Sequence, residues 1–274
     1  MTVILPHAVL PHASAATLLP SERHPAARPA RPARPVPPAP LSPALSKLLA
    51  RLPVQDDGEA LRQSLFHSGT HFNPDLLTSE AERRARLEGV HAALDRAESL
   101  VFLDTESTGG RNGRLIEVAL VETDVEQNVT GGLHFRCNPH RRSLAGARRV
   151  HGIQDCELEH CPEFAARADE LLEAVRGKTV VIHDRTMDLL WLNRELQAAR
   201  PGAPRFEDRC TVVDSFVLAR AIPSERRRNG LDALLEWYGL GARGGHHDAY
   251  GDAALLSRVF FELWWDLDEW LYGE

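Results

Sequence analysis

The chain has 274 residues, of which 43% are hydrophobic and 26% charged, and these values are typical of a globular protein and exclude a fibrous or fully disordered one. The net charge of −7 argues against a general nucleic-acid-binding surface, and no apolar run approaches the ~18 residues of a membrane-spanning helix. Four cysteines without a C-x-x-C pair argue against a disulfide scaffold or a zinc ribbon and favour a cytoplasmic location.

Residues 1–44 differ from the rest of the chain in composition. They hold 11 of the 18 prolines, four arginines and one glutamate, so this segment carries +3 and the remainder carries −10. Prolines at this density exclude a helix and predict a disordered or polyproline-like tail. An arginine-rich start is also typical of mitochondrial transit peptides, but the prolines break the amphipathic helix that such peptides need.

Residues 45–98 are predicted to form a helical extension that packs on the main domain. Four leucines between residues 45 and 52 have helical spacing, and Pro53 ends that segment. Ser79-x-x-Glu82 matches a capping box, which predicts that a second helix begins there. An apolar stripe follows at the spacing of one helix face: Leu87, Val90, His91 and Leu94.

Residues 99–274 have the alternating texture of an α/β domain. Three predicted strands come first, close enough in sequence to be antiparallel neighbours: Leu100–Leu103, Leu115–Thr123 and Val129–Cys137. Helices and strands then alternate: helix Phe164–Val175, strand Thr179–Ile182, helix Leu189–Leu196, strand Arg209–Val213, and helices Phe216–Ala221, Leu231–Tyr238 and Asp248–Leu263. This order predicts a mixed α/β sheet covered by helices.

Two carboxylates end the first predicted strand. Because side chains alternate along a strand, Phe102, Asp104 and Glu106 share one face. If the strand stops at Asp104, both acids lie in a solvated loop. If it continues, two mutually repelling carboxylates predict a site for magnesium or manganese, which prefer hard oxygen ligands.

Asp188 follows the strand Thr179–Ile182 and lies near the start of the next helix. An acid in a first helical turn can simply complement the helix dipole, so the alternatives are a structural role and a catalytic one.

The third group of polar residues surrounds the start of the last helix. If Asp248 caps that helix, His247 lies on the preceding loop and Asp252 one turn inside, so that the two side chains converge. A loop histidine with a pKa near ~6.5 is a candidate proton acceptor, and the alternative is a solvated polar side chain.

Together these three segments resemble, in order, the exonuclease motifs of the DEDD superfamily. The similarity is to the subgroup with histidine in the third motif, which includes the proofreading epsilon subunit of bacterial DNA polymerase III, RNase T and oligoribonuclease. Asp104–Gly109 corresponds to D-x-E-T-T-G, Leu115–Ala119 to the family's second strand, Arg149–Ile153 to its V-H-G-I segment, and His247–Ala253 to H-x-A-x-x-D-A. The second motif departs from H-N-x-x-F-D, with Asp184 in place of asparagine and Met187 in place of the aromatic residue.

The resemblance implies an RNase H-like fold and a two-metal mechanism. It places Asp104 between two Mg²⁺ or Mn²⁺ ions, Glu106 and Asp252 on the first and Asp188 on the second, with His247 as the base. It implies nucleoside 5′-monophosphate products released stepwise from a 3′ end. Family positions near the nucleotide correspond to Thr105, Ser107, Thr108, His151, His183 and Asp184.

The predicted function is therefore a metal-dependent 3′–5′ exonuclease that acts on DNA in proofreading or repair. An exoribonuclease of the same superfamily and a non-catalytic nuclease-fold subunit of a polymerase or repair complex are the alternatives. The acidic C-terminal segment carries Trp264, Trp265 and Trp270, which are candidates for a partner surface or for core packing.

Overall fold

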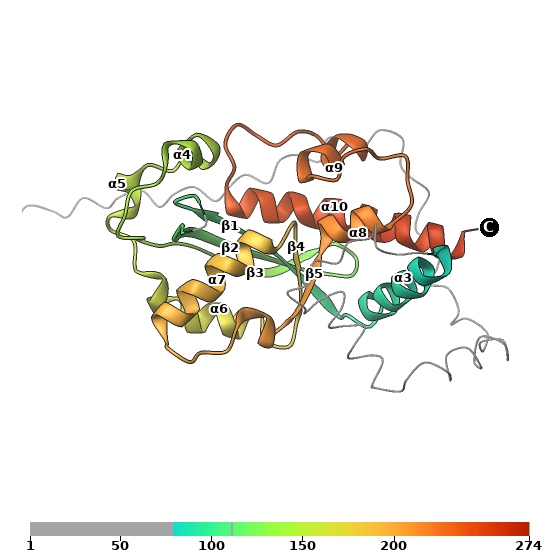
Figure 1. Ribbon diagram of the computed structural model, residues 1–274, viewed down its shortest axis with the longest axis horizontal. Helices are drawn as coiled ribbons and strands as arrows, with labels where there is room; N and C mark the ends of the chain where they lie inside the picture. The colour runs from blue at the N-terminus through green and yellow to red at the C-terminus, as the bar shows by residue number, and fades with distance from the viewer. Residues whose placement is uncertain (1–78, 111, 274) are drawn as a thin grey trace, which may run out of the picture. The chain divides into compact units, whose positions relative to one another are not determined.

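A five-stranded mixed sheet organises the residues that the computed structural model describes, 79–110 and 112–273 (Figure 1). The strand order is β3-β2-β1-β4-β5. β1 pairs antiparallel with β2, and β2 with β3, whereas β1–β4 and β4–β5 are parallel. The strands are β1 Ser99–Ser107, β2 Leu115–Asp124, β3 Val129–Arg136, β4 Thr179–Ile182 and β5 Thr211–Asp214.

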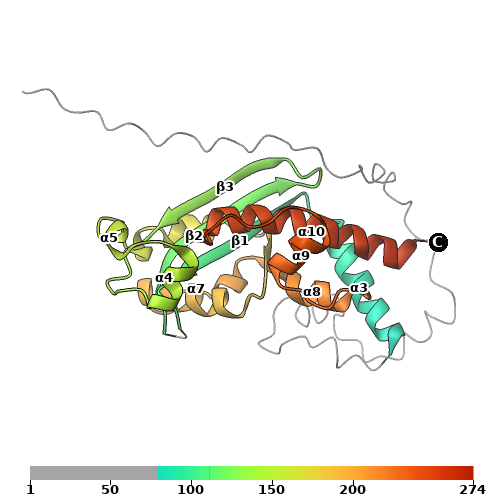
Figure 2. The same ribbon diagram turned by 90° about the horizontal axis from the view of Figure 1, so that it is seen from above.

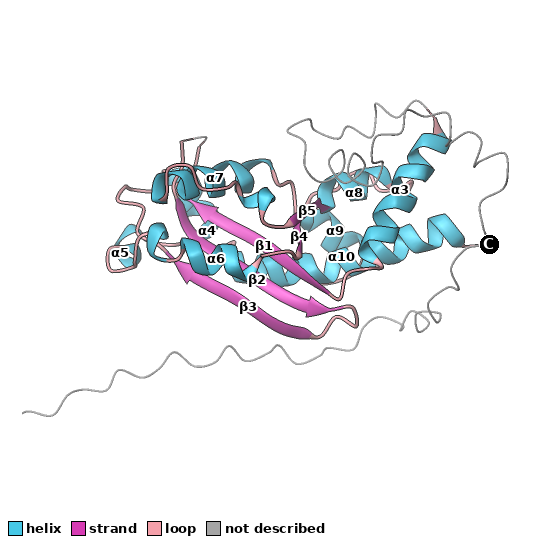
Figure 3. Cartoon of the chain, turned by 90° about the horizontal axis from the view of Figure 1, so that it is seen from below, coloured by secondary structure: helices cyan, strands magenta, loops and turns pink. Residues whose placement is uncertain are grey.

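Helices cover both faces of this sheet. In Figure 2, α10 lies across one face, and Figure 3 shows α6 and α7 on the opposite face. The helices are α3 Glu80–Leu94, α4 Ala145–His151, α5 Asp155–Leu158, α6 Ala168–Ala174, α7 Thr186–Ala199, α8 Ser215–Ala221, α9 Leu231–Trp237 and α10 Ala249–Tyr272. Two 3₁₀ turns, Phe164–Ala166 and Phe206–Asp208, complete the described elements.

The central strand β1 is buried on both faces, which explains its nearly continuous apolar sequence. Phe102 faces α10 and contacts Phe260 and Phe261, with ring centroids 5.7 and 6.0 Å apart. Val101 and Leu103 face the opposite core, which α6 and α7 close. The alternation therefore places Asp104 and Glu106 on the α10 face, directly beyond Phe102.

The predicted fold is confirmed, with differences in element length. β1 does not end at Asp104 but continues to Ser107, so the loop alternative for Asp104 and Glu106 is wrong. The predicted helix Phe164–Val175 is split into a 3₁₀ turn and α6, and the last helix runs nine residues beyond Leu263, to Tyr272. The helices α4 and α5 were not predicted, because neither is long enough to show a periodicity.

The helix predicted after Ser79 is present as α3. The Ser79 hydroxyl accepts a hydrogen bond from the Glu82 amide, and the predicted stripe from Leu87 to Leu94 is buried. Trp264 is a core residue, 2% exposed. The predictions for the tail 1–44 and for residues 45–78 lie outside the described residues. Within the described residues, no helix is long and apolar enough to cross a membrane.

Candidate active site

The carboxyl end of β1 brings two acids into the sheet surface under α10. Glu106 is 9% exposed, and loss of hydration together with the nearby carboxylate of Asp252 raises its pKa to about 8. The pKa of Asp104 is raised well above its usual value by burial and then by three carboxylates: Asp188, Asp252 and Glu106. Asp104 is thus the acid that interacts with all three others, as expected for the centre of the cluster.

Asp188 reaches the cluster from the first turn of α7. The Thr105 hydroxyl donates a 2.6 Å hydrogen bond to Asp188 Oδ1, which ties α7 to β1. Burial nevertheless raises the pKa of Asp188 to about 7, because the Thr105 hydrogen bond only partly offsets the lost hydration. Asp188 therefore belongs to the same group of buried acids as Asp104. A residue that only complements the dipole of α7 would not need to lie in that group.

The start of α10 brings in Asp252 and His247 as the sequence predicted. Asp248 is the N-cap, and its carboxylate accepts from the Gly251 amide at 2.7 Å. His247 lies on the preceding loop, with its Nδ1 3.4 Å from Asp252 Oδ2. Asp252 is 2% exposed, and burial raises its pKa to about 6.

This donor set fits a divalent cation. Ligand atoms of Glu106, His247 and Asp252 lie within 4.8 Å of one another. The pKa values of Asp104, Glu106, Asp188 and Asp252 are all raised, so the cluster lacks sufficient positive charge for four ionised carboxylates. Bound cations supply that charge, and oxygen donors favour hard divalent ions.

Arg243 supplies part of the missing charge from the loop before α10. Its guanidinium Nη1 donates to Asp252 Oδ2 at 2.5 Å and to His247 Nδ1, while its Nε donates to Asp232 at 2.9 Å. This guanidinium contacts the carboxylate of Asp252, one of the three groups that could hold a cation. A hydrogen bond into Nδ1 also occupies the lone pair with which His247 accepts a proton, so Arg243 must move before His247 can act as a base through this nitrogen.

Replacing Arg243 by glutamine is expected to tighten divalent-metal binding roughly tenfold, a difference of about 1.4 kcal/mol, because one competing cation is removed. Calorimetric titration with Mn²⁺ measures this change directly. Arg167→Gln is the matched control, since Arg167 pairs with Glu170 on the surface of α6. Equal metal affinities for Arg243→Gln and the parent protein would mean that Arg243 does not compete for the site.

The metal-free protein is expected to lose stability as the pH rises from about 6.5 to about 8. Folded-state pKa values of about 8 for Glu106 and about 7 for Asp188 lie above those of the unfolded chain, so folding binds protons, and this stabilisation is lost as the two groups ionise. His183 has a folded pKa lowered to about 4 by burial, which has the opposite effect below ~6.5 and defines the lower limit of this window.

Thermal unfolding in EDTA across this pH window measures the loss of stability. Saturating Mn²⁺ should reduce the slope, and Glu106→Gln should reduce it without metal. A melting temperature that is constant or rises from pH 6.5 to 8 in EDTA would contradict the repulsion ascribed to the cluster.

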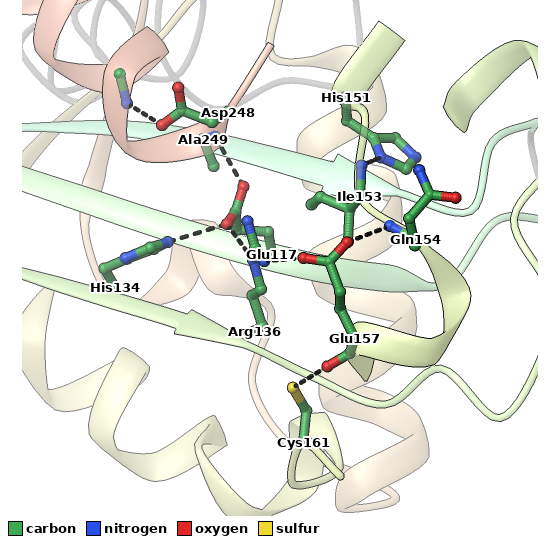
Figure 4. Close-up of polar contacts among 11 residues, drawn as sticks. Glu117, His134, Arg136, His151, Ile153, Gln154, Glu157, Cys161, Asp248 and Ala249 are labelled. Atoms are coloured by element: carbon green, nitrogen blue, oxygen red, sulfur yellow. Dashed lines mark hydrogen bonds and ion pairs between the residues drawn. The ribbon is translucent and has the colours of Figure 1, made fainter. Parts of the chain in front are cut away.

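Glu117 joins the start of α10 to the sheet, as Figure 4 shows. This residue is 1% exposed and is the register partner of both Glu106 on β1 and Arg136 on β3. Its carboxylate accepts from the Ala249 amide at 3.0 Å, Arg136 Nε at 2.8 Å and His134 Nε2 at 3.1 Å. Although burial alone raises the pKa of Glu117, these hydrogen bonds hold it at about 2. Glu117 is thus a positioning residue for the first turn of α10, which carries Asp252.

The six residues predicted near the nucleotide have different surroundings. The Thr105 hydroxyl is bonded to Asp188. The hydroxyls of Ser107 and Thr108 accept from the amides of Gly109 and Arg114, within the loop that follows β1. His151 is buried, with Nδ1 accepting from the Ile153 amide (Figure 4). Contacts of these four residues with a nucleotide stay predictions.

His183 and Asp184 lie at the turn between β4 and α7. His183 Nδ1 lies 2.9 Å from Ser215 Oγ. Asp184 is exposed and has a left-handed backbone with φ of 56°, a conformation that asparagine and aspartate tolerate better than most residues. The Asp214 carboxylate holds this turn by accepting from the amides of Asp184 and Arg185, each at 3.3 Å. Asp184 is therefore a further carboxylate beside the cluster, and with Asp214 it adds to the raised pKa of Asp188.

Sequence reasoning did not identify Arg243, Glu117 or Asp214 as parts of the site. Glu117 lies in a segment that the sequence analysis recognised only as a second strand. The signal that could have pointed to Glu117 is the charged residue Arg136 on the next strand, which is its register partner. Arg243 stands four residues before His247 in a glycine-rich loop, and nothing in its spacing indicates that it turns back to Asp252. Asp214 directly follows the predicted strand Arg209–Val213, and the structure shows that it is the N-cap of α8.

Comparison with known proteins identifies a family and relatives that this chain resembles. Residues 101–260 match the RNase T exonuclease family. The DNA polymerase III epsilon subunit of Rickettsia felis is 34% identical over 168 residues, which cover 60% of this chain and 72% of that protein. The epsilon subunit of Escherichia coli K12 is 33% identical over 172 residues, covering 60% and 70%.

Solved structures extend the likeness to the fold. Two complexes of Escherichia coli exonuclease I, one with single-stranded DNA and zinc and one with an oligonucleotide, superpose with TM-scores of 0.50 and 0.51. Sequence identity is 22% and 21%, and the match covers 63% of this chain but only 40% and 41% of the exonuclease I chains. The likeness to exonuclease I therefore concerns the fold alone.

Proposed function

The chain belongs to the RNase T exonuclease family, and from that premise we propose that it hydrolyses single-stranded DNA from the 3′ end in a proofreading or repair role. The reaction class follows from the family: the chain is a 3′–5′ exonuclease, a phosphodiester hydrolase. The DNA substrate is proposed because the epsilon subunits named above are DNA polymerase subunits. A polymerase is the proposed partner for the same reason.

One observation carries this proposal: residues from three distant segments converge on one small volume. Asp104 and Glu106 come from β1, Asp188 from α7, and Asp252 with His247 from the start of α10. Burial raises the pKa of each carboxylate, repulsion from neighbouring carboxylates adds to it, and a fold without a use for these acids would gain stability by losing them. A non-catalytic module has no physical reason to keep such a group.

We propose that Asp104, Glu106, Asp188 and Asp252 hold two Mg²⁺ or Mn²⁺ ions. When bound, such ions activate the attacking water and stabilise charge on the scissile phosphate and the departing 3′ oxygen. Thr105 fixes the Asp188 carboxylate, and Glu117 fixes the first turn of α10. His247 accepts the proton of the water once Arg243 has left its Nδ1.

Side-by-side digestion of matched DNA and RNA oligonucleotides tests the substrate class. The proposal predicts faster stepwise shortening of the DNA strand from its 3′ end with Mg²⁺ or Mn²⁺. A clear preference for RNA would favour the exoribonuclease alternative, and cleavage of neither strand with either metal would refute a nuclease.

Replacing Asp184 by asparagine is expected to lower the KM for a short DNA strand up to about fivefold. The change removes an exposed negative charge close to Asp188 in the cluster where the scissile phosphate would bind, and such interactions contribute ~0.2–1 kcal/mol. Asparagine also tolerates the left-handed backbone of this position, so the turn is kept. Measuring the KM in 50 mM and 500 mM salt checks that the effect is electrostatic, since the decrease in KM should vanish at high salt.

Asp169→Asn is the control for Asp184→Asn, because Asp169 is an exposed acid on α6 that is ion-paired with Arg200. An unchanged KM for Asp184→Asn at low salt would show that Asp184 does not repel the substrate.

A further inference from the structure

A long stretch of this acidic chain contains no acid. Residues 127–154 lack aspartate and glutamate, although the chain has 39 of them. The same stretch holds five arginines, and four of these lie in residues 141–150, here called the basic segment. A run of positive charge in a protein with a net charge of −7 is a candidate surface for a polyanion.

The basic segment is docked on the rim of the candidate active site. On one side it holds the loop that follows β1: the Leu144 amide donates to Thr108 O at 2.8 Å, and Gly109, with φ of 89°, packs so closely that a Cβ would lie 2.9 Å from Ala147 Cβ. On the other side, Val150 O accepts from the His247 amide at 2.9 Å. Figures 1 and 2 both show α4, most of which lies in this segment, beside the start of α10.

Two of its four arginines are available to a ligand. Arg141 donates to Asn112 O at 2.9 Å, and Arg148 pairs with Asp155 at 3.1 Å. Arg142 and Arg149 are exposed, and neither forms an ion pair within the part of the chain that the structure describes. The basic segment is therefore positively charged at its solvent side, next to the catalytic cluster.

The other two sides of the rim are less suited to phosphate. The turn before α7 presents the exposed carboxylate of Asp184. The hollow between α9 and the loop before α10, about 670 Å³, is lined by Asp232 and Glu236, and its Arg243 is already bound to Asp232 and Asp252. Coulomb repulsion therefore favours an approach of the substrate strand over the basic segment.

We propose that Arg142 and Arg149 bind backbone phosphates of the nucleotides that precede the 3′ end, so that the basic segment is the track along which a single strand enters the site. This inference rests on the proposed nuclease function, and it names the route and the charge that recognises the strand. Phosphate contacts of this kind position a chain without reading its bases.

The test compares a long and a short substrate in the double variant Arg142→Gln/Arg149→Gln. A single-stranded DNA of about ten nucleotides reaches the basic segment, whereas a nitrophenyl ester of a nucleoside 5′-monophosphate occupies only the catalytic cluster. The variant should raise the KM for the oligonucleotide about tenfold and leave kcat/KM for the ester within about twofold of the parent protein. The salt dependence of oligonucleotide binding should lose about 1.4 in log–log slope, or ~0.7 for each lost phosphate contact.

Arg176→Gln/Arg200→Gln is the matched control, because it removes the same charge from exposed arginines that pair with Glu173 and Asp169. It should leave both substrates unaffected. Unchanged oligonucleotide KM in the Arg142/Arg149 variant, equal losses on both substrates, or an equal effect of the control would overturn the proposed track.

The failure of the track and the failure of the proposed function are distinguishable. A DNA strand with phosphorothioate linkages at its 3′ end resists hydrolysis. Its binding in Mg²⁺, measured by fluorescence anisotropy, therefore tests the track without turnover. If the parent protein hydrolyses neither substrate, the proposed function fails. If it hydrolyses both and the Arg142/Arg149 variant binds the strand as tightly as the parent, the track alone fails.

Discussion

Replacing Asp104 by alanine is expected to lower the rate of nucleotide release by roughly 10²–10³-fold, the loss seen when a group that stabilises transition-state charge is removed. Asp104 interacts electrostatically with Asp188, Asp252 and Glu106, so its removal affects the whole cation-binding group. The metal-free variant should unfold at the same temperature as the parent or above it, because one repelling, poorly hydrated carboxylate has gone.

Digestion of a 5′-labelled oligonucleotide and thermal unfolding in EDTA together check the Asp104→Ala prediction. Asp169→Ala is the control for loss of an acid, since Asp169 lies exposed on α6. Parental turnover in Asp104→Ala would show that the assigned cluster is not the active site, and lost turnover accompanied by a lower melting temperature would point to misfolding instead.

Replacing His247 by alanine is expected to lower turnover by roughly 10²–10⁴-fold, the usual contribution of a positioned acid or base. Burial and the neighbouring Arg243 lower the pKa of His247, so the imidazole is mostly neutral at pH 7. The parental rate should rise with pH as the imidazolium loses its proton, and the variant should lack that rise.

His246→Ala provides the comparison for His247→Ala. The His246 ring packs on Gly152, where a Cβ would lie 2.7 Å from the ring, and this contact is structural. His246→Ala should therefore retain most of its activity. The metal affinity of His247→Ala shows whether His247 acts as a base or as a metal ligand. The measurement is needed because a ring nitrogen of His247 lies within 4.8 Å of carboxylate oxygens of Glu106 and Asp252. A crippled His246→Ala beside a normal His247→Ala would refute the assignment of the third motif.

Much of this arrangement could be predicted from local patterns in the sequence. The alternation Phe102, Asp104, Glu106 sets the face of β1, provided that the strand continues, and it does. The Asp248 cap fixes where α10 begins, and with it the convergence of His247 and Asp252. Such features depend on residues a few positions apart, for which strand and helix geometry are sufficient.

The parts that escaped prediction depend on tertiary contacts or on short elements. Glu117 and Ala249 are 132 positions apart in sequence, and their hydrogen bond exists only because α10 crosses β2. The seven-residue α4 has no apolar periodicity, and its docking depends on backbone contacts to Thr108 and His247. Whether β1 continues through two acids also depends on tertiary structure, because pairing with β2 extends it to Ser107.

The most direct test of the central claim is the identity of the first product. A DNA oligonucleotide digested in ¹⁸O-labelled water with Mg²⁺ or Mn²⁺ and analysed by mass spectrometry reveals both the direction of cleavage and the bond that is broken. The carboxylate cluster with His247 predicts nucleoside 5′-monophosphates that carry one ¹⁸O on phosphorus, released one at a time from the 3′ end, and no product in EDTA. Nucleoside 3′-phosphates, release from the 5′ end, or undiminished cleavage in EDTA would contradict it.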